Sequence, residues 1–255
     1  MIIRKNAREI ALMRRAGEIA AAARHVAGEM VTAGTTTKSI DRKVHDYLIS
    51  RGAVPTFLKY RGFPASICIS VNEEVIHGIP SSRKLLQGDL VSIDIGATLH
   101  GYIGDCAATF IVGDNSPESE KHITVTRECF YEGLKYARPG YRVSDISRAI
   151  QEHAEKNGYS VVREYVGHGV GSKLHEPPEV PNYVEVPRRK ADPRLLPGMT
   201  LAVEPMVNAG GAAIRILDDG STIVTADGKN SAHYENTILI TDDEPEILTV
   251  STLEV

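Results

Sequence analysis

Four carboxylate side chains occur inside segments that otherwise have the composition of buried β-strands. An ionised carboxylate buried without a partner costs several kcal/mol, so it finds a cation or changes its protonation state. A salt bridge to Arg or Lys explains any one of these acids, but four in one sheet favour a common cation. The segments are LVSIDIGA (90–97) with Asp94, GDCAATFIV (104–112) with Asp105, MTLAVEPMV (199–207) with Glu204 and HYENTILIT (233–241) with Glu235.

Asp94 and Asp105 are eleven residues apart in a segment that has the pattern of a β-hairpin turning near Leu99 and His100. This separation predicts that the two acids lie directly opposite each other, with Cβ atoms about 4.5 to 5.5 Å apart. Two carboxylates that close repel unless they share a proton or a metal, and a pair of metals about 3.5 to 4 Å apart suits bridging carboxylates. Strand alternation puts them on one face with Ser92, Gly96, Ala107 and Thr109.

Helical spacing and capping residues predict four helices around these strands. The matches between the two helix pairs recur at an offset of 106 residues, among them Gly34 with Gly140 and Gly52 with Gly158, which indicates a worn internal duplication. We therefore expect an α+β fold in which a central, mainly antiparallel sheet is covered by two pseudo-symmetric helix pairs. The helices are predicted at 6–31, at 37–51 before Gly52, at 116–136 from a Ser116 cap with Pro117 in the first turn, and at 144–157 before Gly158.

Length and composition bound the remaining possibilities. A chain of 255 residues suits one domain over 1–255, here with pseudo-repeats of about 1–113 and 114–255. No run approaches the roughly 18 apolar residues of a membrane span, and a net charge of −4 gives no basic footprint for nucleic acid. An odd number of cysteines, three, and charged residues throughout the first thirty predict a reducing, cytoplasmic location.

Three of the nine histidines lie in segments suited to chemistry. His168 stands between two glycines in VGHGVG, His175 follows seven residues later beside a Pro-Pro pair, and His77 precedes a Gly-Ile-Pro turn. Glycines that flank a ligand let the backbone or a substrate approach closely. We expect structural roles for the other six, of which His25, His45, His122 and His153 fall on predicted helices and His100 and His233 do not.

These residues together resemble a known family. GHGVGSKLHEPPEVPNY, the two aspartates eleven apart, LAVEPM and SAHYENTILIT are similar to the type I, bacterial-type methionine aminopeptidases, which have the pita-bread (creatinase/aminopeptidase) fold. The resemblance covers nearly the whole chain, including YRGFPASICISVNEEVIHGIP. It implies a metal-dependent hydrolase that removes the N-terminal methionine from peptides and nascent chains with a small second residue.

The resemblance also implies the role of each site residue. Two divalent metal ions, Mn, Fe, Co or Zn, are expected, with Asp105 and Glu235 bridging, His168 and Glu204 on one ion and Asp94 on the other. A water activated by the metals would attack the scissile carbonyl while Glu204 shuttles its proton. His175 would polarise the carbonyl oxygen, and His77 would contact the scissile amide.

The methionine pocket carries over less completely. Near the metals, Gly96 stands where several relatives have Thr. In the pocket, Tyr60, Phe63 and Cys68 match the substrate-binding positions of the family, whereas Leu174 and Ser221 replace the Phe and Trp of several relatives. One wall of the pocket is therefore expected to be more open. The resemblance further implies a monovalent cation near Asn72 and Ser231, a monomer, and substrates met at the ribosome, with no membrane or nucleic-acid partner.

Two other functional classes of protein have the same fold. Xaa-Pro aminopeptidases and prolidases have the same ligand set but normally carry an extra N-terminal domain, for which we expect no room ahead of the first helix. Some pita-bread domains are non-catalytic peptide binders, but these generally lose the metal ligands. Since all five ligand positions are filled here, methionine removal is the expected function.

Overall fold

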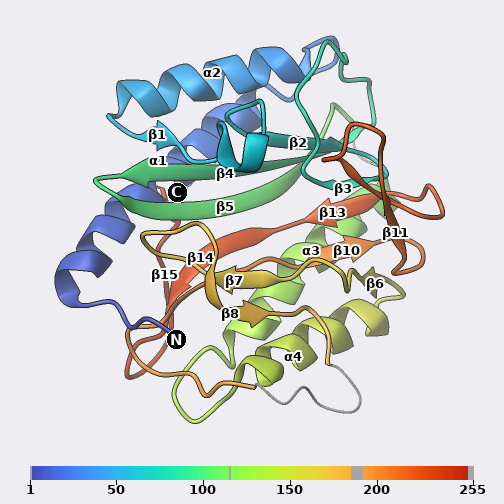
Figure 1. Cartoon of the computed structure of the whole chain (residues 1–255). Helices are drawn as coiled ribbons and strands as arrows, with labels where there is room; N and C mark the ends of the chain where they lie inside the picture. The colour runs from blue at the N-terminus through green and yellow to red at the C-terminus, as the bar shows by residue number, and fades with distance from the viewer. Residues whose placement is uncertain (1, 115, 185–191, 252–255) are drawn as a thin grey trace.

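The computed structural model describes residues 2–114, 116–184 and 192–251, and it contains the four expected helices (Figure 1). The first begins with a capping box, in which Asn6 Oδ1 accepts from the Glu9 N–H and the Glu9 carboxylate accepts from the Asn6 N–H. Ser116 caps the third, which has Pro117 in its first turn. The helices are α1 (Ala7–Glu29), α2 (Thr37–Ser50), α3 (Pro117–Leu134) and α4 (Val143–Lys156).

Each helix pair is followed by a glycine in the left-handed region, as expected. Gly52 after α2 has φ +74° and Gly158 after α4 has φ +87°. Glycine adopts this conformation without the steric cost that a Cβ would add, so it stops a helix at a defined residue. Within the described ranges, no helix is long and apolar enough to cross a membrane.

The strands form one large sheet and two small ones, and all of the strand pairs described are antiparallel. The path β1-β4-β5-β14-β9-β7-β8, with β2 beside β4 and β15 beside β14, makes the large sheet. Its strands are β1 (Val54–Pro55), β2 (Cys68–Val71), β4 (Leu90–Leu99), β5 (Tyr102–Ile111), β7 (Gly167–Gly169), β8 (Glu176–Val180), β9 (Thr200–Val203), β14 (Glu235–Leu239) and β15 (Glu246–Ile247). The small sheets are β6 (Ser160–Val161) with β10 (Met206–Asn208) and β13 (Ser231–His233), and β3 (Glu74–Ile76) with β11 (Ile214–Ile216) and β12 (Ile223–Thr225).

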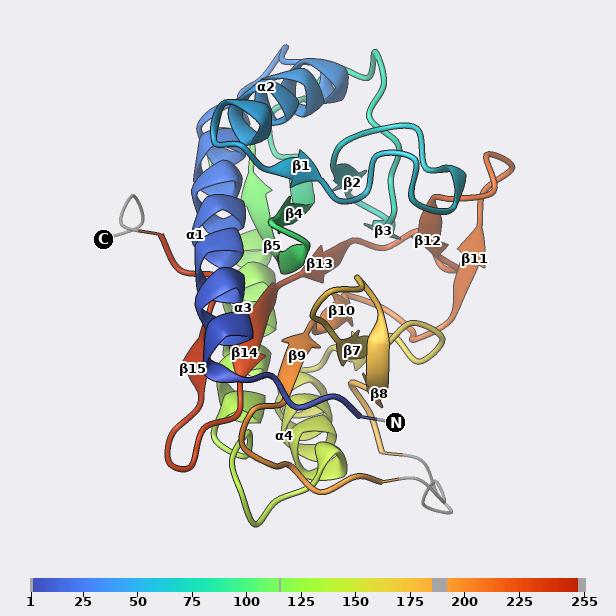
Figure 2. The ribbon, with the colours of Figure 1, turned by 60° about the vertical axis from the view of Figure 1, so that its left-hand side comes forward.

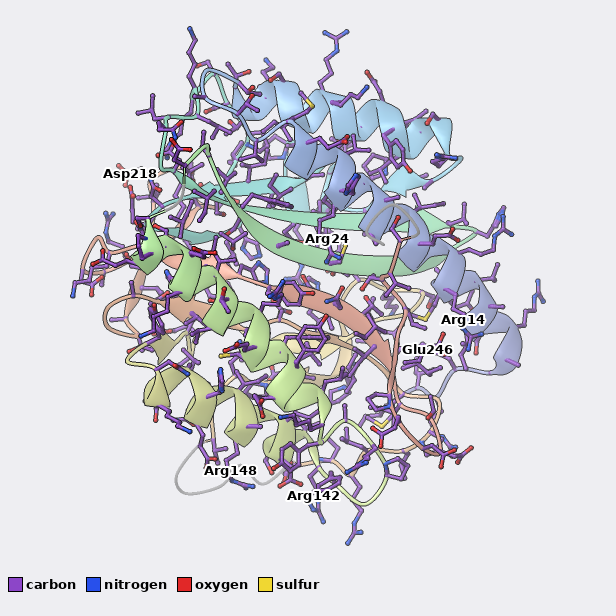
Figure 3. The ribbon with its side chains drawn as sticks, turned by 180° about the vertical axis from the view of Figure 1, so that it is seen from behind. Arg14, Arg24, Arg142, Arg148, Asp218 and Glu246 are labelled. Atoms are coloured by element: carbon purple, nitrogen blue, oxygen red, sulfur yellow. The ribbon has the colours of Figure 1, made fainter. Side chains whose placement is uncertain are left out.

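The helices cover one face of the large sheet and leave the other for the site (Figure 2). One apolar core joins α1 and α2 to β2 and β4, and a second joins α3 and α4 to β9 and β14. Helix α1 lies very close to β5, because a Cβ on Gly104 would be 2.5 Å from the Gly17 Cα. On this side Arg24 reaches β14, donating to the Glu235 carbonyl at 3.3 Å and to Asn236 Oδ1 at 3.2 Å (Figure 3).

Two of the expected strands are broken, which corrects the prediction of continuous runs at 199–207 and 233–241. The first run divides into β9 and β10 at Glu204 and Pro205, and the second into β13 and β14 at Tyr234. Proline has no N–H for a strand ladder, and the Pro205 carbonyl instead accepts from the Tyr234 N–H at 3.2 Å. At the first break the chain passes from the large sheet into the small sheet of β10 and β13, and at the second it passes back into the large sheet.

Candidate metal centre

The β4–β5 hairpin places Asp94 and Asp105 on the same face but not directly opposite each other, which corrects the prediction. Asp94 pairs with Ala107, and Asp105 pairs with Gly96. The turn lies at His100 and Gly101, with φ of +50° and +82°, one residue later than expected. The two acids are therefore diagonal neighbours, a separation that charged side chains still span.

The pairing of neighbouring strands aligns the site residues in two adjacent rows across the large sheet. In one row Asp94, Ala107 and Glu235 follow each other over β4, β5 and β14. In the next, Thr237 and His168 lie on either side of Ala202 of β9. Strand alternation gives both rows the same face. The residues that stand in the middle of these rows, Ala107 and Ala202, are small.

His168 and Glu204 complete the cluster. Nε2 of His168 lies 3.5 Å from Glu204 Oε1 and 3.9 Å from Asp105 Oδ2. Donor atoms of Asp105, His168 and Glu235 all lie within 4.8 Å of one another, so one ion can contact all three. Glu204 sits at the break after β9, where the chain turns out of the sheet.

The hydrogen bond of His168 leaves its other nitrogen free to bind a metal. Nδ1 is 3.0 Å from the Gly169 carbonyl oxygen, which can only accept, so Nδ1 carries the proton. Burial, followed by the nearby His175, lowers the pKa of His168 to about 3, and the ring is neutral. The unprotonated Nε2 thus faces the carboxylates with its lone pair, the arrangement of a metal-ligating histidine.

The carboxylates themselves lack the partners that buried acids need. One oxygen of each of the four acids is buried without a hydrogen-bond partner, namely Asp94 Oδ1, Asp105 Oδ1, Glu204 Oε1 and Glu235 Oε1. Burial raises the pKa of Asp94 to about 7. Burial first, and then the neighbouring acids, hold the pKa values of Asp105, Glu204 and Glu235 well above their usual range. Divalent cations would remove this strain, and one nitrogen with several oxygens suits Mn, Fe, Co or Zn.

The two further expected histidines lie beside this cluster. The His175 ring centroid is 4.3 Å from that of His168, and Tyr60 Oη is 2.8 Å from His175 Nδ1. Burial, then Arg61, lowers the pKa of His175. His77, at φ +58°, stacks edge-on against Tyr165 at 5.5 Å, and burial followed by His175 lowers its pKa to about 4.

The expected substrate-pocket residues belong to one apolar cluster next to the acids. Tyr60, Phe63, Cys68 and Leu174 are all members of it, and Cys68 pairs with Asp94 across β2 and β4. Ser221 Oγ donates to the His77 carbonyl at 3.1 Å. At Gly96 a Cβ would lie 2.7 Å from Phe57 and 2.8 Å from Thr56, so these two side chains fill the space beside this residue.

Two residues of the site were not expected from the sequence. His233, for which a structural role was expected, points its unpartnered Nε2 at Glu204 Oε2 (4.0 Å) and Glu235 Oε2 (3.9 Å). Asn182 is fully buried and donates to the Glu204 carbonyl at 3.0 Å. The signal for His233 was its place two residues before Glu235, which alternation puts on the same face.

Comparisons with known proteins agree with this geometry. The model of metallopeptidase family M24 matches residues 11–242. A methionine aminopeptidase of Clostridium perfringens is 52% identical over 250 residues, covering 98% of this chain and 99% of the relative. The crystal structure of the Thermotoga maritima methionine aminopeptidase superposes with a TM-score of 0.94 at 41% identity, covering 98% of this chain and 99% of that one. A prolidase from Pyrococcus furiosus shares the fold, with a TM-score of 0.78 at 24% identity, and this chain covers 65% of its length.

Proposed function

The chain belongs to metallopeptidase family M24 as one of its methionine aminopeptidases, and we propose that it cleaves the N-terminal methionine at the centre between β4, β5, β7, β9 and β14. The observation that carries this site is the set of four buried carboxylates, each with an unpartnered oxygen, around the neutral His168. We assign it two divalent metal ions. Asp105 and Glu235 would bridge them, His168 and Glu204 would hold one, and Asp94 the other.

When bound, these ions supply the positive charge that polarises the scissile carbonyl and lowers the pKa of a water molecule. The protein residues do the rest. Glu204 accepts a proton from the attacking water and returns it to the leaving nitrogen. His175 donates a hydrogen bond to the carbonyl oxygen as negative charge develops there, and His77 contacts the scissile amide.

The apolar cluster of Tyr60, Phe63 and Cys68 supports a pocket for the methionine side chain beside Asp94. The free α-amino group of the substrate would lie near the acids. A small second residue, nascent chains at the ribosome, a monomeric state and a monovalent cation at Asn72 and Ser231 remain predictions. The Asn72 carbonyl already accepts from the Ser231 N–H at 2.8 Å, so the two positions are adjacent.

We also propose that residues 1–255 form one catalytic domain of two pseudo-repeats, which the two helix pairs support. Since the donors come from strands of both halves, the site would lie where the halves meet. We also propose a cytoplasmic location, since none of Cys68, Cys106 and Cys129 forms a disulfide in the described part of the chain.

The test is methionine release from a Met-Ala-Ser peptide by chelator-stripped protein after Mn(II) or Co(II) is added back. Leu-Ala-Ser and Ala-Pro-Ala serve as matched controls. Metal-restored cleavage of the Met peptide alone is the expected result. Cleavage of Ala-Pro-Ala instead would assign a proline-directed peptidase, and no cleavage with metal bound would indicate a peptide-binding module.

A further inference from the structure

Lys5 and Glu176 form an ion pair that is buried on both sides. Lys5 Nζ lies 2.6 Å from Glu176 Oε2, and each side chain is 3% exposed. Burying such a pair costs desolvation free energy that the attraction barely offsets, so a buried pair is poor evidence for stability. What it fixes is the relative position of two segments that are 171 residues apart in the chain.

Both partners are held by their own segments. Lys5 immediately precedes the cap of α1, and its N–H donates to the Gly198 carbonyl at 2.6 Å. Glu176 Oε1 accepts from the Lys173 N–H at 3.2 Å, so one carboxylate binds Lys5 through one oxygen and the loop backbone through the other. The pair therefore connects the rigid start of α1 to the loop of residues 171–175.

This loop ends in His175, the residue directly before Glu176. Gly171 lies against the pair, since a Cβ there would be 2.4 Å from Lys5 Cε and 2.6 Å from Glu176 Oε1. The Gly171 carbonyl accepts from the Ile103 N–H at 3.0 Å, which ties the start of the loop to β5. The far end of the loop runs into Glu176, the first residue of β8, which pairs with Gly169 of β7 and whose only charged partner among the described contacts is Lys5.

We propose that Lys5 is a positioning residue for His175, acting through Glu176. The ion pair fixes the position of the His175 ring beside His168. In that position the ring can donate a hydrogen bond to the substrate carbonyl. This inference rests on the role given to His175 in the proposed function. A misplacement of about 1 Å in a reacting group costs about a hundredfold in rate, which gives the pair a catalytic consequence far from any substrate contact.

The test compares Lys5→Met, Glu176→Gln and the double variant, all loaded with Mn(II), on Met-Ala-Ser. We expect kcat to fall about tenfold to a hundredfold in each, with KM and Mn(II) affinity nearly unchanged. The double variant should be no slower than the slower single variant, because the two residues act as one unit. Hydrogen–deuterium exchange of the peptide covering 171–180 should become faster in all three.

Arg14→Gln is the control, because it removes a partly exposed ion pair between α1 and β15 and leaves the buried pair of Lys5 and Glu176 intact. Arg14 Nε lies 2.6 Å from Glu246 Oε1, and Figure 3 labels both residues in the view from behind. This variant should keep parental kcat and parental exchange at 171–180. Parental kcat and exchange in Lys5→Met and Glu176→Gln, even with a lower Tm, would overturn the proposal. If the parent itself cleaves no peptide, the proposed function fails, and the exchange comparison still decides whether the pair holds the loop.

Discussion

Nε2 of His168 and Oε1 of Glu204 lie 3.5 Å apart, with no hydrogen-bond partner for that glutamate oxygen. They come from adjacent strands, β7 and the end of β9, and face the same space as Asp105 and Glu235. A glutamate in this position can ligate a metal through one carboxylate oxygen and accept or donate a proton through the other. Glu204 therefore has two assigned roles, as a metal ligand and as a proton acceptor.

Glu204→Gln keeps the shape of the side chain but removes its charge and its basicity. General base catalysis contributes about a hundred- to ten-thousandfold, so we expect kcat to fall about a thousandfold. Steady-state kinetics with saturating Mn(II) measures this. A loss below tenfold would assign the proton transfer to another residue.

His175→Ala is expected to separate catalysis from metal binding. The ring contacts His168 but is not in our ligand set, so both ions should remain bound while kcat falls about a hundred- to a thousandfold, the cost of removing one donor to a developing oxyanion. Metal content by atomic emission and kcat on Met-Ala-Ser provide the check. Normal turnover would exclude His175 from the reaction.

Asp94→Asn should weaken one of the two metal sites and spare the other. Asp94 is diagonal to Asp105 and is our ligand to the second ion only. Calorimetric titration with Mn(II) should show one binding event near the parental affinity and one weakened by about tenfold or more, since affinity follows the charge count of the ligands. Equal weakening of both events would contradict the ligand assignment.

The metal-free protein should lose stability as the pH rises. The folded pKa of Asp94 is about 7 against 3.8 for an ordinary aspartate, so the folded state binds this proton more tightly than the unfolded state. Its stabilising effect is complete below about pH 4 and is lost as the pH rises through about 7. Asp105, Glu204 and Glu235 shift in the same direction.

Thermal melts of chelator-stripped protein between about pH 5 and pH 8 test this linkage. The Tm should fall across that range, and saturating Mn(II) should remove most of the fall. Asp94→Asn, which cannot ionise, should flatten part of the metal-free curve. A flat curve for the stripped parent protein would show that the acids do not titrate as described.

Gly17→Ala should destabilise the fold although it raises helix propensity. The added Cβ would lie 2.2 Å from the Leu248 carbonyl oxygen, so α1 must move away from the segment that follows β15. Overpacking of this kind costs about 1 to 3 kcal/mol. Gly211→Ala is the control, since its Cβ would meet nothing nearer than 3.9 Å. Urea denaturation compares the two, and equal midpoints would refute the close contact.

The helices were predictable because their signals are local. Four of the helix ends are set by a capping residue or a glycine within a few positions, and each of these lies where the sequence indicated: Asn6, Ser116, Gly52 and Gly158. The four carboxylate residues of the site were predictable for a similar reason, because each is a charged residue inside a segment of otherwise apolar residues.

The sequence predicted the wrong register, strand ends or role where the position of a residue depends on contacts with distant parts of the chain. The hairpin register moved by two residues because the turn uses His100 and Gly101, and Asp94 consequently pairs with Ala107. The breaks at Pro205 and Tyr234 follow from a contact between two strands. His233 enters the site because its strand lies beside Glu204, and the one local signal for this was its place two residues before Glu235.

The two rows of donors across β4, β5, β14, β9 and β7 also bear on how the protein acquires metal. The donors lie between residues 94 and 235, on strands that become neighbours only when the whole sheet has formed. An incompletely folded chain therefore offers scattered weak ligands and no pocket. Metal capture would occur at the last stage of folding, and its binding free energy would stabilise the assembled sheet as a unit rather than any single segment.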